Sequence, residues 1–130
     1  MTLSKKTIHT DSAPKALGPY SQAIKAGDFI YTAGQVGLDP RTGEIVPGGI
    51  EAETKQVFLN IQNILVAAGS SLELVIKTTV YLRDIQDFGA MNGIYATFFP
   101  SNPPARSTVQ VAALPRGVAI EIDTVAIVAQ

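Results

Sequence analysis

Two acidic side chains stand inside an apolar segment near the carboxyl end of the chain. Glu121 and Asp123 lie in the run 118–128, where strand alternation places both carboxylates on one face. Burial of an ionised carboxylate is unfavourable and raises its pKa toward the range of a general base or acid. We therefore single out Glu121 as a candidate catalytic group. The alternative is a solvated or ion-paired acid, because structural ion pairs also perturb a pKa.

Arg106 and Tyr20 are candidates for binding. Arg106 opens a segment, residues 106–111, whose other members carry no charge. A lone guanidinium there can bind a carboxylate through two parallel hydrogen bonds, although it could equally form an internal salt bridge to Glu121 or another acid. Tyr20 follows Gly18 and Pro19, at a loop or strand entry where its hydroxyl could meet a ligand, although most such tyrosines only pack.

The composition is that of an ordinary folded protein, and we expect residues 1–130 to form a single domain. Hydrophobic residues make up 46% and charged residues 16% of the sequence. The net charge of −1 gives no field that would attract nucleic acid or an anionic membrane. The absence of cysteine excludes a disulfide framework, a thiolate nucleophile and a cysteine metal site. The amino terminus has no long apolar run and no later stretch matches a membrane span, so we expect a cytoplasmic protein.

Turn residues divide the first half of the chain into three predicted elements. A short segment around Ile24 and a strand over 29–33 are expected to pair as a hairpin. Gly69 suits the left-handed cap at the end of a helix, and Ser70 with Glu73 has the spacing of a capping box. The helix itself is predicted by apolar residues at helical spacing: Val57, Ile61, Ile64, Leu65 and Ala68.

The second half of the chain contains three predicted strands and one helix. Residues 76–82 alternate between apolar and polar side chains, as in a half-buried strand. A helix is expected from about Asp84, and Pro100 prevents its continuation. Two more strands are predicted over 106–111 and 118–128.

This order of elements predicts an α+β fold, a mixed sheet with two helices packed on one face. Both faces of the last strand are largely apolar, whereas two helices can cover only one side of a sheet. A large exposed apolar face is unusual on a soluble monomer. We therefore expect the chain to associate with copies of itself.

An ordered set of short motifs carries a resemblance to a known family over essentially the whole chain. The motifs are Ala13-Pro14, Gly18-Pro19-Tyr20-Ser21-Gln22-Ala23, Ala33-Gly34-Gln35, Lys77-Thr78-Thr79-Val80-Tyr81-Leu82, Asp87-Phe88, Met91-Asn92, Pro104-Ala105-Arg106-Ser107, Val111-Ala112 and Ala119-Ile120-Glu121-Ile122. Each motif is weak alone, and their order makes the set specific. With them, the chain resembles the Rid (reactive intermediate deaminase, or YjgF) family.

The resemblance implies a fold, an assembly and a reaction. The fold would be chorismate-mutase-like, and the assembly a homotrimer whose ligand clefts lie between neighbouring subunits. The reaction would be the hydrolysis of 2-iminobutanoate or 2-iminopropanoate, formed from enamines, to 2-oxo acids and ammonia. Neither a metal nor an organic cofactor is expected, because the iminium is itself the electrophile. The expected partners are the imine and other copies of the chain, without membrane or nucleic acid.

The resemblance also implies roles for individual residues. Arg106 matches the arginine that anchors the substrate carboxylate, and Glu121 matches the glutamate that positions and activates water. Tyr20 matches a cleft-lining tyrosine, Gly34 supplies backbone contacts beside the reacting centre, and Asn92 matches a cleft asparagine without a defined role.

Thr108 departs from the family pattern, because several members carry a reactive cysteine at this position. The threonine removes thiol-based redox regulation and covalent capture of a ligand there. We expect Thr108 and Arg106 to face the same side of their strand, where both can affect substrate preference.

Two other functions remain open at this point. RNA cleavage or translation inhibition is also attributed to the family, but metal-free RNA cleavage usually needs an acid–base pair and cationic support. The sole histidine, His9, lies near the amino terminus and Lys5-Lys6 is a small basic cluster, although Arg106 could hold a phosphate. A protein that senses a 2-oxo acid without turnover would need Arg106 and Tyr20, and only an enzyme would need Glu121 for chemistry.

Overall fold

The computed structural model describes residues 4–130; the first three residues of the amino-terminal segment discussed above lie outside this range. The strands are β1 (Lys5–Ile8), β2 (Ala23–Ala26), β3 (Phe29–Thr32), β4 (Gln35–Val36), β5 (Val75–Leu82), β6 (Ala105–Gln110) and β7 (Ile120–Ile127). The helices are α1 (Gly49–Ala67) and α2 (Phe88–Phe98), with 3-10 turns at Leu72–Leu74, Ile85–Asp87 and Pro115–Gly117. None of the helices described is long and apolar enough to cross a membrane.

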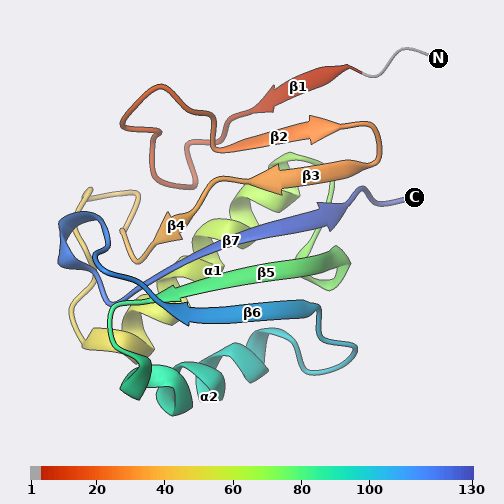
Figure 1. Cartoon of the computed structure of the whole chain (residues 1–130). Coiled ribbons are helices and arrows are strands. Elements are labelled where there is room, and N and C mark those ends of the chain that lie inside the picture. The colour runs from red at the N-terminus through yellow and green to blue at the C-terminus, as the bar shows by residue number, and fades with distance from the viewer. Residues whose placement is uncertain (1–3) are drawn as a thin grey trace.

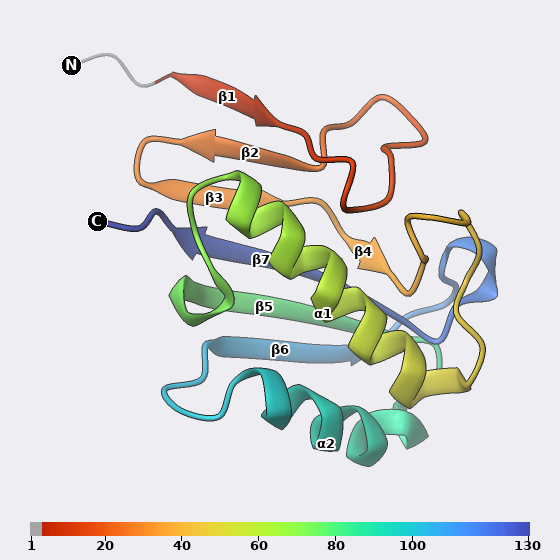
Figure 2. The ribbon, with the colours of Figure 1, turned by 180° about the vertical axis from the view of Figure 1, so that it is seen from behind.

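The strands form one mixed sheet in the order β1-β2-β3-β7-β5-β6, with β4 paired to β7 beyond the end of β3 (Figure 1). Neighbouring strands are antiparallel except β5 and β6, which are parallel and are connected through α2. Both helices lie on the same face of the sheet (Figure 2). The predicted α+β architecture and the β2–β3 hairpin are confirmed.

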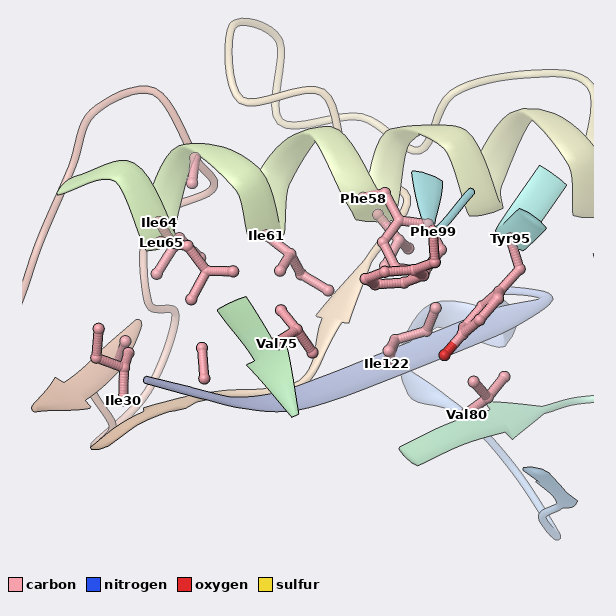
Figure 3. Close-up of a cluster of buried hydrophobic side chains, with 14 of the residues drawn as sticks. Ile30, Phe58, Ile61, Ile64, Leu65, Val75, Val80, Tyr95, Phe99 and Ile122 are labelled. Carbon is pink, nitrogen blue, oxygen red and sulfur yellow. The ribbon is translucent and has the colours of Figure 1, made fainter. Parts of the chain in front are cut away.

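The core lies between the two helices and the sheet (Figure 3). The apolar stripe predicted for the first helix faces inward: Val57, Ile61, Ile64 and Leu65 are fully buried and Ala68 is 6% exposed, and Phe58 is buried with them. They pack over Ile30 of β3, Val80 of β5 and Ile122 of β7, each 0% exposed. Removal of this much apolar surface from water is the main stabilising contribution, at roughly 25 cal/mol per Å².

The end of α1 confirms one predicted signal and corrects another. Gly69 has φ 84, the left-handed conformation that closes the helix. The capping box predicted over residues 70–73 is wrong, because the N-cap residue of the following turn is Ser71 and its side chain forms no capping bond. The Ser70 hydroxyl instead donates to the carbonyl of Ile127 at 2.6 Å and ties the turn to the end of β7.

The second helix begins later than predicted. Instead of an α-helix from Asp84, a 3-10 turn at Ile85–Asp87 precedes α2, which begins at Phe88. The Asp84 side chain accepts from the backbone N–H of Gln86 at 2.9 Å, and the N–H of Ile85 donates to the Gln110 side chain at 2.8 Å. These side chains satisfy the first amides of the segment, so the chain turns before it becomes α-helical.

The face of the sheet opposite the helices is uncovered in the single chain, as predicted from the helix count (Figures 1 and 2). Cross-strand partners share a face, which places Tyr31 beside Val125 and Thr79 beside Asp123 on this side. Tyr31 is 48% and Phe29 43% exposed. The open face therefore combines exposed aromatic groups on β3 with a polar cluster where β5 and β7 meet.

Candidate active site

A pocket of about 530 Å³ opens beside the polar end of the uncovered face. Its walls are mostly apolar, with a few polar groups, which is the usual composition of a site for a small molecule. The lining residues are Leu17, Tyr20, Ala33, Gly34, Val36, Leu38, Pro115, Arg116 and Glu121. Three of the residues singled out in the sequence, Tyr20, Gly34 and Glu121, thus meet in one pocket.

Gly34 and Glu121 are in direct contact because β4 pairs with β7, where Val36 is the partner of Glu121. A Cβ atom at Gly34 would lie 2.8 Å from the Glu121 Cδ atom and would collide with its carboxylate oxygen Oε2. Glycine is therefore required here for space and not for an unusual backbone conformation. The close approach fixes the carboxylate beside the backbone of Gly34.

The electrostatic surroundings disfavour ionisation of Glu121. Burial raises the pKa of the Glu121 carboxyl group, and the negative charge of Asp123 raises it further. Asp123 accepts a hydrogen bond from the Tyr81 hydroxyl at 3.0 Å, and burial followed by this bond raises the pKa of Tyr81. The result is a carboxyl group whose proton affinity is better matched to acid–base work near neutral pH.

Tyr20 lies on a loop that is held in shape by the buried side-chain amide of Gln22. The Tyr20 hydroxyl accepts from the backbone N–H of Leu17 at 3.2 Å, and the side chain is 52% exposed. Behind it, Gln22 is 2% exposed, accepts from the N–H of Thr10 at 2.7 Å and donates to the carbonyl of Pro14 at 2.8 Å. These bonds hold the segment before β2 against the sheet and present Tyr20 to the pocket.

Arg106 lies in a second pocket, of about 520 Å³, between α2 and the edge strand β6. The guanidinium carbon is 4.6 Å from the ring centroid of Tyr95 and 5.4 Å from that of Phe88. Within residues 4–130 no ion pair includes Arg106, so the alternative of an internal salt bridge to Glu121 is not realised. The pocket is lined by Asn92, Tyr95, Ala96, Phe99, Pro103, Pro104 and Arg106.

The two pockets belong to opposite faces of the sheet. Arg106 is the partner of Thr78, whose hydroxyl meets Tyr95 of α2 on the helix side. Glu121 is the partner of Tyr81 on the uncovered side. The structure therefore brings Tyr20, Gly34 and Glu121 together and places Arg106 with Asn92, but it does not unite the two groups within one chain.

Thr108 shares the helix side of β6 with Arg106, as predicted, because its strand partner Val80 is buried beneath the helices. In the part of the chain described, Thr108 Oγ1 and Asn92 Oδ1 are buried polar atoms without a hydrogen-bond partner. Buried polar atoms usually find partners, so each unsatisfied one calls for an explanation. Asn92 lines the same pocket as Arg106, and Thr108 lies two residues after Arg106 in β6.

Comparisons with known proteins identify the family of the chain. The family model described as Endoribonuclease L-PSP matches residues 10–128. A RutC family protein of Pyrococcus horikoshii is 56% identical over 122 residues, which cover 94% of this chain and 97% of that protein. The 2-iminobutanoate/2-iminopropanoate deaminase of Mus musculus is 51% identical over 126 residues, covering 97% and 93%. The chain belongs to the Rid family.

A solved structure supports the same assignment for the fold of this Rid chain. The crystal structure of RidA from an Antarctic Psychrobacter superposes with a TM-score of 0.92 at 46% identity, covering 95% of this chain and 99% of that one. The resemblance identified from the motifs is thus confirmed at the level of family and fold.

Sequence reasoning missed two buried polar residues that support the Glu121 pocket of this Rid chain. Glu53 accepts from the backbone N–H of Ala119 at 2.9 Å, just before β7. Asn60 donates to the carbonyls of Val36 at 3.2 Å and Leu38 at 2.9 Å, on either side of the end of β4. Both residues lie on the buried stripe of α1. A polar residue at a position where the helical spacing calls for an apolar one was the sequence signal that could have identified them.

Arg116 lies at the Glu121 pocket, whereas His9 lies outside both pockets. Arg116 lines the Glu121 pocket with φ 58, donates to the Gly43 carbonyl at 3.2 Å and lies 3.8 Å from Glu44. The sequence gives no signal for this role, because Arg116 lies between the strands predicted over 106–111 and 118–128. His9 bonds to Asp11 at 3.0 Å on the surface and lines neither of the two pockets.

Proposed function

We propose that this Rid chain hydrolyses 2-imino acids, including 2-iminobutanoate and 2-iminopropanoate, to 2-oxo acids and ammonia. The observation that carries this proposal is the Glu121 carboxyl group, which lies in a small pocket against Gly34 with its pKa raised by burial and by Asp123. The name of the mouse relative supports the same substrate class.

The reaction follows from what each group can do to a protonated imine. Glu121 takes a proton from water as the water oxygen bonds to the imine carbon, which gives a carbinolamine. Glu121 then delivers the proton to nitrogen. The carbon–nitrogen bond breaks to release ammonia while the carbinolamine hydroxyl gives its proton to the Glu121 carboxylate and becomes the carbonyl, and that proton leaves with ammonia as ammonium. One carboxyl group can serve as base and then as acid when its pKa is near the working pH. Arg106 anchors the substrate carboxylate through two hydrogen bonds and sets the distance to the water.

The complete site in this proposal lies between two copies of the chain. Glu121 and Arg106 occupy opposite faces of one sheet, so one chain cannot present both to a small molecule. We propose a homotrimer in which the uncovered face of one copy meets the α2–β6 edge of the next. The exposed rings of Phe29 and Tyr31 support such an interface, because association would remove them from water.

Within this assembly, Tyr20 and Gly34 contribute the wall on the Glu121 side. Asn92 and Thr108 contribute polar atoms on the Arg106 side, where Asn92 Oδ1 and Thr108 Oγ1 have no partner in the described part of a single chain. A ligand or a neighbouring copy would supply the missing hydrogen bonds.

A coupled assay tests the proposal. An amino-acid oxidase generates 2-iminobutanoate or 2-iminopropanoate in the presence of semicarbazide, which traps the surviving imine. We expect the wild type to suppress semicarbazone formation and Glu121→Ala to lose this effect. Imine decay unaffected by the wild type, or equal activity of the variant, would contradict the proposal.

Binding of 2-oxobutanoate by calorimetry separates turnover from sensing. Glu121→Ala is expected to retain affinity for the 2-oxo acid, whereas Arg106→Ala is expected to lose it, because only the arginine engages the carboxylate. Binding by the wild type without any imine turnover would favour the sensing function.

A further inference from the structure

The anchor arginine has an unusual support. Arg106 is partly buried, yet it forms no ion pair within residues 4–130. Its guanidinium carbon lies over Tyr95 at 4.6 Å and over Phe88 at 5.4 Å from the ring centroids. Aromatic faces attract a cation without occupying its N–H donors. A supporting carboxylate would occupy those donors and would have to be displaced by a substrate carboxylate.

Tyr95 is held more rigidly than a surface aromatic would be. The side chain is 6% exposed, and its hydroxyl is 2.8 Å from the Thr78 hydroxyl in β5. Thr78 is in turn the strand partner of Arg106, so the anchor of the ring and the cation that lies over it are neighbours in the sheet. The ring also packs at 5.5 Å from Phe58 and 4.9 Å from Phe99.

Phe88 differs from Tyr95 because it is 38% exposed and closes the outer side of the guanidinium. The inner ring therefore determines where the guanidinium lies, and the outer ring shields it. Because the two rings and the pocket walls keep part of the water away from the guanidinium, the cation–π attraction is stronger here than at an exposed site.

We propose that Tyr95 is a positioning residue that holds the Arg106 guanidinium by its ring face, with its donors left free for the carboxylate of the substrate. This inference rests on the proposed function for the identity of the substrate. Its physical content, the affinity of Arg106 for a carboxylate, is measurable without turnover.

Two substitutions at Tyr95 separate the ring from the hydroxyl. Tyr95→Phe keeps the ring and leaves the buried Thr78 hydroxyl without its partner, so it should lower stability while KM changes less than about twofold. Tyr95→Leu removes the ring and should raise both KM for 2-iminobutanoate and Kd for 2-oxobutanoate by about tenfold, with a smaller change in kcat.

Leu65→Ala provides the control for lost core packing. Leu65 is fully buried at the other end of the hydrophobic cluster, remote from Tyr95 (Figure 3). The variant should lower Tm as much as Tyr95→Leu does and leave KM unchanged. If Leu65→Ala raises KM as much, or if Tyr95→Leu binds 2-oxobutanoate as the wild type does, the proposed positioning role is overturned.

Phe88→Leu keeps the inference testable if Tyr95→Leu does not fold. Because Phe88 is partly exposed, its loss should leave Tm near the wild-type value while Kd for 2-oxobutanoate rises several-fold. An unchanged Kd in a folded Phe88→Leu protein would overturn the inference. A wild type that binds 2-oxobutanoate but hydrolyses no imine would remove the proposed function and leave the role of Tyr95 to be decided by the Kd values.

Discussion

The carboxylate of Glu121 occupies the space that any side chain at Gly34 would need. We expect Gly34→Ala to displace the carboxylate and to lower kcat/KM for 2-iminobutanoate by about a hundredfold, because small misplacements of a reacting group have effects of this size. Steady-state kinetics with the oxidase-coupled assay measures the loss.

Gly93→Ala is the matched control for this change. Gly93 lies in α2, and a Cβ added there meets no atom within 4 Å. Alanine is the better helix former, so stability should rise by up to about 1 kcal/mol with unchanged activity. Similar activity losses in both variants would mean that the contact with Glu121 is not the cause.

The pH dependence of turnover should report the pair formed by Glu121 and Asp123. A general base acts only when ionised, and the charge of Asp123 raises the pKa of the Glu121 carboxyl group. Asp123→Asn removes this charge and keeps an oxygen that can accept from the Tyr81 hydroxyl. The acidic limb of the kcat/KM profile should therefore move to lower pH. A limb that stays in place or moves upward would rule out this electrostatic coupling.

Glu121 should make the folded chain less stable at neutral pH, where its carboxyl group ionises, than at acidic pH, where the group is protonated. Burial raises the pKa of its carboxyl group above the ordinary value of 4.5, so the folded chain binds the proton more tightly than the unfolded chain. The resulting stabilisation is complete below pH 4.5 and is lost as pH rises through the folded-state pKa. Glu121→Gln should therefore have a higher Tm than the wild type at pH 7, and the difference should shrink toward acidic pH.

Thermal unfolding across this pH range measures the effect. Glu73→Gln makes the same change in net charge at an exposed position and serves as the control. An equal rise in Tm for both variants, or a lower Tm for Glu121→Gln at pH 7, would contradict burial as the cause.

Much of the fold was predictable because local signals and packing agree. The alternation over residues 78–82 and the apolar stripe of α1 specify their faces against the core. Ile76 departs from the predicted alternation: it is 43% exposed, because the register shifts between Val75 and Lys77 and Val75 takes the buried position. β1 was missed because only Ile8 of its four residues is buried, and a polar edge strand leaves no apolar alternation. The two-residue β4 is too short for any pattern, although it sets the contact between Gly34 and Glu121.

The candidate site was less predictable than the fold. Residue type and spacing pointed to Arg106 and Glu121, but the register of β6 and β7 against β5 decides that they lie on opposite faces. The aromatic partners of Arg106 depend on how α2 packs over β6, which no spacing in the sequence specifies.

Thr108 offers a test of the Arg106 side. Its Oγ1 atom is buried without a hydrogen-bond partner among the described residues, which is unfavourable. Thr108→Val keeps the shape and should raise the free energy of unfolding by about 1 kcal/mol in denaturant titrations. If the hydroxyl serves the substrate, KM should rise several-fold at the same time. A loss of stability would show instead that the hydroxyl is already satisfied in the folded protein.

The sharpest prediction concerns the division of the site between copies. Glu121→Ala and Arg106→Ala should each be nearly inactive alone, since each lacks one half of every cleft. The two proteins are mixed in equal amounts, unfolded together and refolded. A cleft is then intact if the copy that supplies its Glu121 side is the Arg106→Ala protein and the copy that supplies its Arg106 side is the Glu121→Ala protein. Random association in a trimer restores about one quarter of the clefts. Activity should therefore return to about a quarter of the wild-type value, whereas a site within one chain would gain nothing from mixing. Light scattering on the same samples gives the oligomeric mass, and a monomer would exclude the shared cleft outright.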